Sequence, residues 1–186
     1  MKPKKNQAGS IYEAQGMDAC QTPSYAVTPL LSYLHPYWKV WEPAAGAYHL
    51  VDALRANEQE VYPTDLLTGD NFFDYTPMYF DAIVTNPPYS IKYPWIERCC
   101  ELGKPFALLV PLETMGAKGL QKLWDQYDFR FLLFSDRIDF KMPEKGWDSH
   151  AQFPVCWLTW NILPQQIVRA DIIDAKKAFK KAHRNG

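Results

Sequence analysis

The chain has 186 residues, of which 47% are hydrophobic and 15% aromatic, and its formal net charge is −1. This length and apolar content predict one packed domain spanning residues 1–186 and exclude a disordered chain. The near-neutral balance excludes a basic field over the whole surface. The terminal stretches MKPKK and KKAFKKAHR are locally basic, and such segments are either solvated or in contact with phosphates. We expect residues 1–16 and 184–186 to be flexible tails.

The four cysteines are expected to be free thiols. Cys20, Cys99, Cys100 and Cys156 form no C-x-x-C pair, and no histidine lies beside them at ligand spacing, so we predict no metal site. Free thiols are typical of a reducing compartment, which favours a cytoplasmic location. No apolar run approaches the roughly 18 residues of a membrane span, and no signal peptide is visible. We therefore expect no membrane partner.

Apolar spacing and turn residues predict alternating strands and helices. In chain order the pattern predicts helix 22–34, strand 39–43, helix 44–57, strand 60–66, strand 80–86, helix 91–103, strand 106–112, helix 117–127, strand 130–135, strand 155–161 and helix 171–183. The stretch between the second and third strands is irregular. Gly103 is expected to end its helix in a left-handed conformation.

This alternation predicts a three-layer α/β fold with a mainly parallel sheet. Residues 106–112, FALLVPL, form an unbroken apolar run, which is typical of a strand buried on both faces. The last two strands are joined by residues 136–154, which show no helical pattern, so we expect a hairpin-like pair with one antiparallel strand near the C-terminus. Ligands bind such sheets at the carboxyl ends of the strands, near the topological switch point. Functional residues should therefore follow the strands directly.

Two acidic side chains follow the first two predicted strands. In EPAAG, residues 42–46, Glu42 precedes small residues and a glycine, which lets the backbone approach a ligand at a helix start. The pattern is neither G-x-G-x-x-G nor a P-loop, and a carboxylate there suits a cationic ligand better than a phosphate. Asp65 ends the next strand, where an acid can hold ribose hydroxyls. For each acid taken alone, an ordinary turn is the more common explanation.

The stretch NPPY, residues 86–89, follows the third predicted strand. The lone pair of an exocyclic base amine is delocalised into the ring, so the amine is a poor nucleophile. The amide oxygen of Asn86 and the backbone carbonyl of Pro87 can accept its two N–H groups and stabilise developing charge. Pro88 restricts the residue before it, and Tyr89 offers a ring on which a base can stack. A turn would explain the prolines and the asparagine but not the tyrosine.

Taken in order, these motifs resemble those of S-adenosylmethionine-dependent amino methyltransferases, above all the adenine-N6 DNA methyltransferases. The resemblance covers roughly residues 17–160 and includes QTPSYAVTPLLSYL, which is similar to the family's Thr-Pro segment. It implies a Rossmann-like class I methyltransferase fold and methyl transfer to the N6 amine of adenine in DNA. It also implies S-adenosylmethionine as the cofactor, S-adenosylhomocysteine as the product, and no metal.

The resemblance also implies roles for particular residues. The methionine part of the cofactor would be held by Thr22, Pro23, Glu42, Ala44 and Gly46, with Glu42 near its ammonium. Asp65 would bind the ribose, and Asn71 and Phe72 would contact the adenine ring. The target amine would be held by the catalytic motif, which comprises Asn86, Pro87, Pro88 and Tyr89.

The sequence departs from the family pattern at two places. The second glycine of the cofactor motif would fall at Tyr48, which puts the geometry of that loop in question. The stretch between Asp65 and Asp81 is also too short for a full helix and strand.

An amine inside a duplex is out of reach, so we expect the enzyme to flip its target base. The loop over residues 137–153 would then bind the substrate: Phe140 and Trp147 offer rings for the second face of the base, and Arg137, Lys141 and Lys145 offer charges for phosphates. A surface loop with buried aromatics is the competing interpretation. Because the chain has no room for a separate recognition domain, we expect short or relaxed specificity, or recognition completed by a homodimer.

Other substrates carry the same kind of planar amine. Relatives with N-P-P-Y methylate base amines in RNA or the amide of a glutamine in a release factor, and cytosine N4 is a further alternative. The Thr-Pro segment favours the DNA class. The alternative without catalytic activity is an inactive module that binds nucleic acid or a partner. Only Tyr48 supports this alternative.

Overall fold

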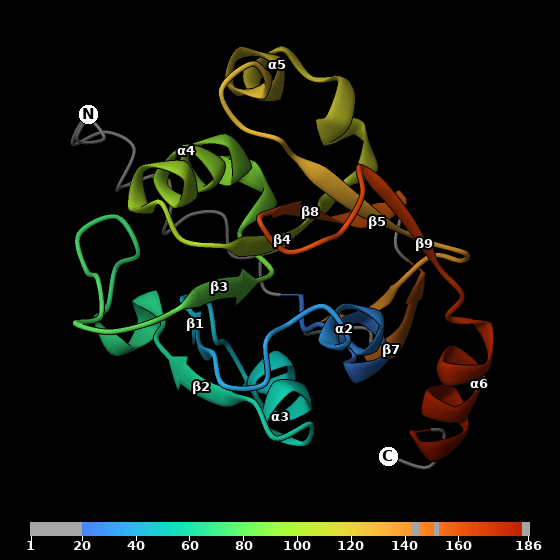
Figure 1. Cartoon of the computed structure of the whole chain (residues 1–186). Coiled ribbons are helices and arrows are strands. Elements are labelled where there is room, and N and C mark those ends of the chain that lie inside the picture. Colours follow the sequence, from blue (N-terminus) through green and yellow to red (C-terminus); the bar gives the residue numbers. More distant parts are fainter. Residues whose placement is uncertain (1–19, 143–145, 151–152, 184–186) are drawn as a thin grey trace.

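The structure is a computed structural model that describes residues 20–142, 146–150 and 153–183 (Figure 1). Its main sheet has seven strands in the order β2-β1-β3-β4-β8-β5-β9. Their bounds are β1 Lys39–Glu42, β2 Glu60–Pro63, β3 Ala82–Thr85, β4 Phe106–Pro111, β5 Arg130–Phe134, β8 Val155–Trp160 and β9 Ile167–Ala170. A separate hairpin contains β6 Asp139–Met142 and β7 Gly146–His150.

Helices cover both faces of this sheet (Figure 1). The α-helices of the described residues are α2 Ser24–Leu31, α3 His49–Arg55, α4 Lys92–Leu102, α5 Lys118–Trp124 and α6 Ile173–Ala182. Side chains of α2 and α3 share one hydrophobic cluster with Val40, Val84 and Leu109. Side chains of α4 and α5 share a second cluster with Ile83 and Leu108. Since successive residues of a strand point to opposite faces, the two clusters lie on opposite sides, which confirms the three-layer α/β prediction.

The strand directions also agree with the prediction. Strands β2, β1, β3 and β4 are mutually parallel, and β5 runs parallel to β9. Strand β8 inserts between β4 and β5 and is antiparallel to both. It supplies the antiparallel strand expected near the C-terminus. All six residues of β4 are buried, as its unbroken apolar run predicts.

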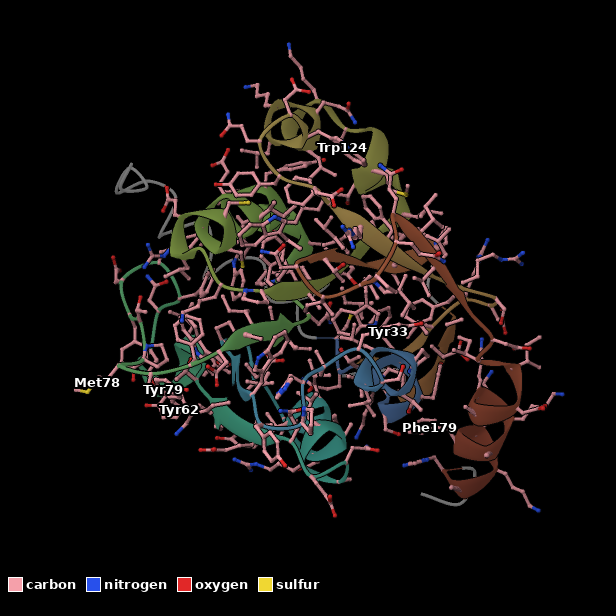
Figure 2. All side chains as sticks on the ribbon, in the orientation of Figure 1. Tyr33, Tyr62, Met78, Tyr79, Trp124 and Phe179 are labelled. Carbon is pink, nitrogen blue, oxygen red and sulfur yellow. The ribbon has the colours of Figure 1, made fainter. Side chains whose placement is uncertain are left out.

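Aromatic side chains fill much of the space between helix and sheet. On the α5 side, Trp124 stacks on Phe131 of β5 with ring centroids 5.5 Å apart, and Figure 2 shows Trp124 below α5, facing the sheet. On the other side, the indole N–H of Trp157 donates to the carbonyl of Ala26 at 2.8 Å, and both residues are fully buried. Gly103 ends α4 in the left-handed conformation, with φ of 63°, as predicted.

Two features differ from the sequence expectation, and a third agrees with it. Residues 139–150 contain the β6–β7 hairpin, so the connection between β5 and β8 is not a simple loop. Strand β9 was not predicted, because a four-residue segment with one buried side chain carries little periodic signal. The stretch between β2 and β3 holds a 3₁₀ turn over Leu66–Thr68 and no strand, which agrees with the expectation that a helix and strand do not fit there.

All four cysteines are free thiols, as predicted. Burial raises the pKa of Cys100 and of Cys156 to about 12, so both stay protonated at neutral pH. No helix within the described residues is long and apolar enough to cross a bilayer. The predicted tails, 1–16 and 184–186, lie outside the part of the chain that the structure describes.

Candidate functional site

The sheet has its switch point at β1. The chain passes from β1 to β2 on one side and then to β3 on the other, and all three strands are parallel. Their carboxyl ends therefore lie at one edge, where such sheets bind ligands. A cavity of about 500 Å³ opens there. The predicted site residues that line it are Thr22, Ala44, Gly46, Asp65, Asn71, Phe72, Asn86 and Pro88.

The loop after β1 is held in shape by its own backbone amides. The amide of Ala44 donates to Glu42 Oε1 at 2.9 Å, and the amide of Gly46 donates to Asp65 Oδ2 at 2.8 Å. Gly46 has φ of 49°, in the left-handed region that glycine tolerates. A Cβ on Gly46 would lie 3.2 Å from Gln21 Nε2. Glycine is therefore favoured at position 46 by the backbone conformation, and the Gln21 side chain would have to shift by a few tenths of an ångström to admit a Cβ.

Tyr48 occupies the position at which the family's cofactor motif has its second glycine. It adopts the left-handed conformation, with φ of 66° and ψ of 7°, directly before α3. Such a conformation costs a residue with a side chain roughly 1–2 kcal/mol. The loop thus keeps a backbone path suited to glycine although a tyrosine occupies the position. The Tyr48 ring is 40% exposed and does not line the cavity.

Glu42 lies beneath the loop and not on the cavity wall. Its side chain is completely buried, and burial raises its pKa to about 8. The hydroxyl of Thr85 and the amide of Ala44 act in the opposite direction by stabilising the charged form. The Thr85 hydroxyl does so without a hydrogen bond of standard geometry, because Glu42 Oε2 has no such bond within the described residues. A cation bound above the loop would supply the missing counter-charge.

Asp65 is placed to organise two loops at once. Its Oδ2 accepts from Gly46, and its Oδ1 accepts from the amide of Leu67 at 2.8 Å in the following 3₁₀ turn. Each carboxylate oxygen has two acceptor sites, so both can still accept a hydroxyl group from a ligand in the cavity. The predicted contact with a ribose is compatible with this geometry.

Gln21 was missed by the sequence analysis, although it directly precedes the Thr-Pro segment. Its side-chain Oε1 accepts from the amide of Ala47 at 3.1 Å. Its backbone pairs with Lys141 of β6 through two hydrogen bonds of 3.0 Å. Gln21 therefore joins the loop after β1 to the β6–β7 hairpin. Only the three-dimensional contact of residues 21, 47 and 141 reveals this role.

One end of the cavity is aromatic. Phe72 stacks on Trp95 with centroids 4.1 Å apart and an interplanar angle of 14°, and Phe73 meets Trp95 edge-on at 6.0 Å. Asn71 caps its own turn, since it accepts from the amide of Phe73 at 3.1 Å and donates to Asp74 at 2.9 Å. Its polar groups are thus already engaged by neighbouring residues. The aromatic surface suits a flat ring such as a purine.

Phe72, which is predicted to contact the adenine ring, therefore lines the cavity, but most of the other lining residues were not predicted. The lining residues absent from the prediction are Cys20, Gln21, Pro43, Ala45, Leu50, Leu66, Leu67, Phe73, Ser90, Ile91 and Trp95. Ile91 and Trp95 follow NPPY closely in the chain. Because NPPY lies at the end of β3, residues shortly after it are expected near the same strand end, and this proximity could have identified both.

The NPPY motif leaves β3 at the cavity. Asn86 lines the cavity, is half-buried, and its Oδ1 has no hydrogen-bond partner among the described residues. Pro87 is buried, whereas Pro88 contributes to the wall. Tyr89 is half-buried beside the wall and packs edge-on against Phe140 at 6.5 Å. The motif thus presents one unsatisfied amide oxygen next to the cavity.

The predicted substrate residues are spread along the 137–153 segment. Phe140 is buried against Tyr89, with 5% of its side chain exposed. Arg137 is exposed and lines a different cavity, beside α6. Lys141 is half-buried in β6. Lys145 and the Trp147 side chain lie outside the described part of the structure, so all five roles stay predictions.

Pro23 and Thr22 hold the start of α2 at the cavity. Thr22 is buried to 4% exposure and lines the wall, while buried Pro23 occupies the N-cap position of α2. Among the described residues, no group of three or more His, Cys, Asp or Glu side chains is placed to hold a metal ion.

Solved structures with the same architecture provide a comparison. The chain superposes on a protein from Listeria monocytogenes named as a class I S-adenosylmethionine-dependent methyltransferase. The TM-score is 0.54 at 13% identity, over 88% of this chain and 71% of that one. The chain has a class I methyltransferase fold. A second structure with this fold is the methyltransferase subunit of a type I restriction-modification system from Streptococcus thermophilus, with a TM-score of 0.58 at 11% identity.

The superposition on that subunit covers 95% of this chain but 56% of the subunit, so the chain spans little more than half of its length. No protein-family model matches the chain, and no curated protein matches it. The evidence for the class I methyltransferase fold is therefore structural similarity, and the evidence for the reaction is the geometry of the site.

Proposed function

We propose that the protein is an S-adenosylmethionine-dependent methyltransferase that acts on the N6 amine of adenine in DNA. The observation that carries the proposal is the position of Asn86. It leaves β3 at the switch point, lines the cavity, and holds an amide oxygen without a partner among the described residues. A buried acceptor left unpaired costs roughly 1–3 kcal/mol, so its retention is best explained by a ligand donor.

The residues around the cavity fit the three parts of the proposed cofactor. The cavity volume of about 500 Å³ lies within the usual range for small-molecule sites. Phe72 and Trp95 would pack against the adenine ring, and Asp65 would accept from the ribose hydroxyls. Glu42 would act on the ammonium from beneath the loop, where a buried charge is weakly screened. When bound, S-adenosylmethionine supplies an electrophilic methyl group on a sulfonium.

The chain's own residues would then prepare the nucleophile. Asn86 Oδ1 and the Pro87 carbonyl accept the two N–H groups of the target amine, which localises the nitrogen lone pair and stabilises the positive charge that develops on nitrogen. Proline at position 87 fixes the direction of its carbonyl, because its φ is locked by the ring. The Tyr89 ring would support a base flipped out of the duplex.

The experiment is a parallel incubation of the protein and labelled S-adenosylmethionine with DNA, RNA or a release-factor protein. The proposal predicts label in DNA, and N6-methyl-2′-deoxyadenosine after digestion to nucleosides. Base flipping with short or relaxed specificity further predicts methylation at many sites of mixed-sequence DNA. Label confined to RNA or protein would refute the DNA assignment. Binding of nucleic acid without any transfer would support the inactive module instead.

A further inference from the structure

Lys92, the first residue of α4, closely follows the catalytic motif in the chain. Its ammonium donates to the carbonyl of Tyr89 at 3.3 Å and lies 5.1 Å from the centroid of the Tyr93 ring. The residue is half-buried. Ile91 directly before it lines the switch-point cavity, as does Trp95, which is one helical turn further along the same face of α4. The charge of Lys92 is therefore held at the border of that cavity.

This charge is not neutralised by an acid. Lys92 takes part in no ion pair within the part of the chain that the structure describes. Its neighbours one turn along the helix are Trp95 and Ile96, which are both apolar. A carbonyl and a ring face attract a cation but carry no net charge, and an ammonium has three donors. Lys92 can therefore donate to an anion without first losing an ionic partner.

Helix stability does not account for a lysine at this position. The first turn of α4 contains no acidic residue, and a cation there lies at the positive end of the helix dipole, which disfavours it. Helices α4 and α5 pack on the same face of the sheet (Figure 1). The Tyr93 ring lies close against the backbone of α5, since a Cβ on Gly119 would lie 2.7 Å from its Cδ1 atom. The ring that holds the ammonium of Lys92 is thus itself fixed in place.

Two kinds of anion are available at this border, namely the carboxylate of S-adenosylmethionine and a phosphate of the substrate. The methionine part of the cofactor is assigned to Thr22, Glu42 and Gly46, which belong to other elements than α4. Lys92 is instead anchored to Tyr89, which is assigned to the target base. The anion that accompanies every base in DNA is the phosphate of its own backbone. The contact with Tyr89 therefore favours the phosphate.

We propose that Lys92 binds a backbone phosphate of the DNA beside the flipped adenine. The inference rests on the proposed DNA methyltransferase function, because it takes Tyr89 as the support of the target base. A phosphate contact positions the nucleotide without reading its sequence. It thereby supplies affinity to an enzyme with short or relaxed specificity.

The first measurement is the affinity of a fluorescent DNA duplex as a function of salt concentration. Each phosphate contact contributes about −0.9 to the slope of log affinity against log salt. Lys92→Gln should therefore make the slope shallower by about 0.9. Lys92→Arg keeps the charge and should retain the wild-type slope. Neither variant should change the affinity for S-adenosylmethionine.

Lys104 provides a matched control. Its ammonium also lies over a ring, 6.0 Å from the centroid of Phe80, and it too forms no ion pair among the described residues. It precedes β4, so it lies at the edge of the sheet opposite to the carboxyl ends of the parallel strands. Lys104→Gln removes the same charge and should leave the salt slope unchanged.

A second measurement locates the phosphate. In a duplex whose methylated adenine has been mapped with the wild type, each phosphate that flanks this nucleotide is replaced in turn by a neutral methylphosphonate. One of these replacements should weaken binding by the wild type roughly tenfold. The same replacement should have little effect on Lys92→Gln, because that variant has already lost the contact.

The outcomes separate this inference from the function beneath it. If the wild type methylates DNA but Lys92→Gln keeps the wild-type slope, the phosphate contact is refuted while the proposed function stands. The same holds if Lys104→Gln lowers the slope equally, or if Lys92→Gln loses affinity for S-adenosylmethionine and not for DNA. If the wild type binds S-adenosylmethionine but neither binds nor methylates DNA, both proposals are refuted.

Discussion

Replacement of Glu42 by glutamine should change how the stability of the protein depends on pH. The carboxyl is completely buried, and its pKa rises from 4.5 to about 8 on folding. Between these values the folded protein binds a proton that the unfolded chain has released. The free energy of unfolding therefore falls as pH rises from 4.5 to 8, by about 1.4 kcal/mol per pH unit. Over about 3.5 pH units the loss is about 5 kcal/mol.

Glutamine has nearly the same shape and does not ionise. Its amide oxygen can still accept from Ala44, and its amide nitrogen can donate to the Thr85 hydroxyl, which has no hydrogen bond of standard geometry within the described residues. Urea unfolding between pH 5 and 9 should show that Glu42→Gln removes most of the decline, which over this window is about 4 kcal/mol. The control is Glu113→Gln, which changes an exposed side chain and should keep the wild-type profile. Parallel profiles for wild type and Glu42→Gln would refute the assignment of the raised pKa.

Glu42→Gln should weaken cofactor binding, although it should stabilise the fold at high pH. A bound ammonium favours the ionised form of Glu42, so wild-type affinity for S-adenosylmethionine should increase as pH rises towards 8. Loss of a charge-assisted interaction should weaken binding by Glu42→Gln roughly tenfold or more and flatten its pH dependence. Calorimetric titration at several pH values measures both effects. A variant that is stabilised at high pH and still binds the cofactor normally would contradict the electrostatic role.

Three further substitutions test the framework of the site. Gln21→Met removes the acceptor for the amide of Ala47 and should raise the KM for S-adenosylmethionine roughly 2- to 10-fold, with kcat nearly unchanged in steady-state assays. Gly46→Ala places a Cβ at a φ of 49° and 3.2 Å from Gln21 Nε2; it should cost about 1–2 kcal/mol in urea unfolding and weaken cofactor binding. Trp157→Phe leaves the Ala26 carbonyl without the indole donor and should cost about 2 kcal/mol in thermal or urea unfolding.

Each of these has a result that would contradict it. Gln126→Met makes the same change at an exposed position beyond α5 and should leave the KM unaltered. A matching rise in KM for that control, or a Gln21→Met effect on kcat alone, would speak against a positioning role for Gln21. An unchanged unfolding midpoint in Gly46→Ala or Trp157→Phe would mean that the surrounding structure relaxes without cost.

The sheet could be predicted from the sequence because its strands are short apolar runs bounded by turn residues. Residues 106–112 illustrate this, since their apolar run became the fully buried β4. Strand β9 escaped because its exposed residues carry no periodic pattern, and its pairing with β5 is a tertiary contact. The β6–β7 hairpin escaped for the same reason, since nothing local marks its partner strands.

The site was predictable where its residues follow strand ends. Asp65 and Asn86 lie at the switch-point cavity because parallel strands place their carboxyl ends at one edge. Gln21 could not be found this way, because its function lies in contacts with residues 47 and 141. The burial of Glu42 was also hidden, since sequence does not show that Pro43 and Ala44 form the wall in front of it. Tyr48 looked incompatible with the motif until its backbone proved to adopt the glycine-like conformation.

The central claim is tested most directly by measuring methyl transfer to DNA and S-adenosylmethionine affinity in the same preparations of wild type and Asn86→Ala. Loss of a preorganised acceptor at the reacting amine should lower kcat by about 100-fold or more. Cofactor affinity should stay within about threefold of wild type, since the amide oxygen is assigned to the target amine. Wild-type rates of N6-adenine methylation by Asn86→Ala would contradict the account.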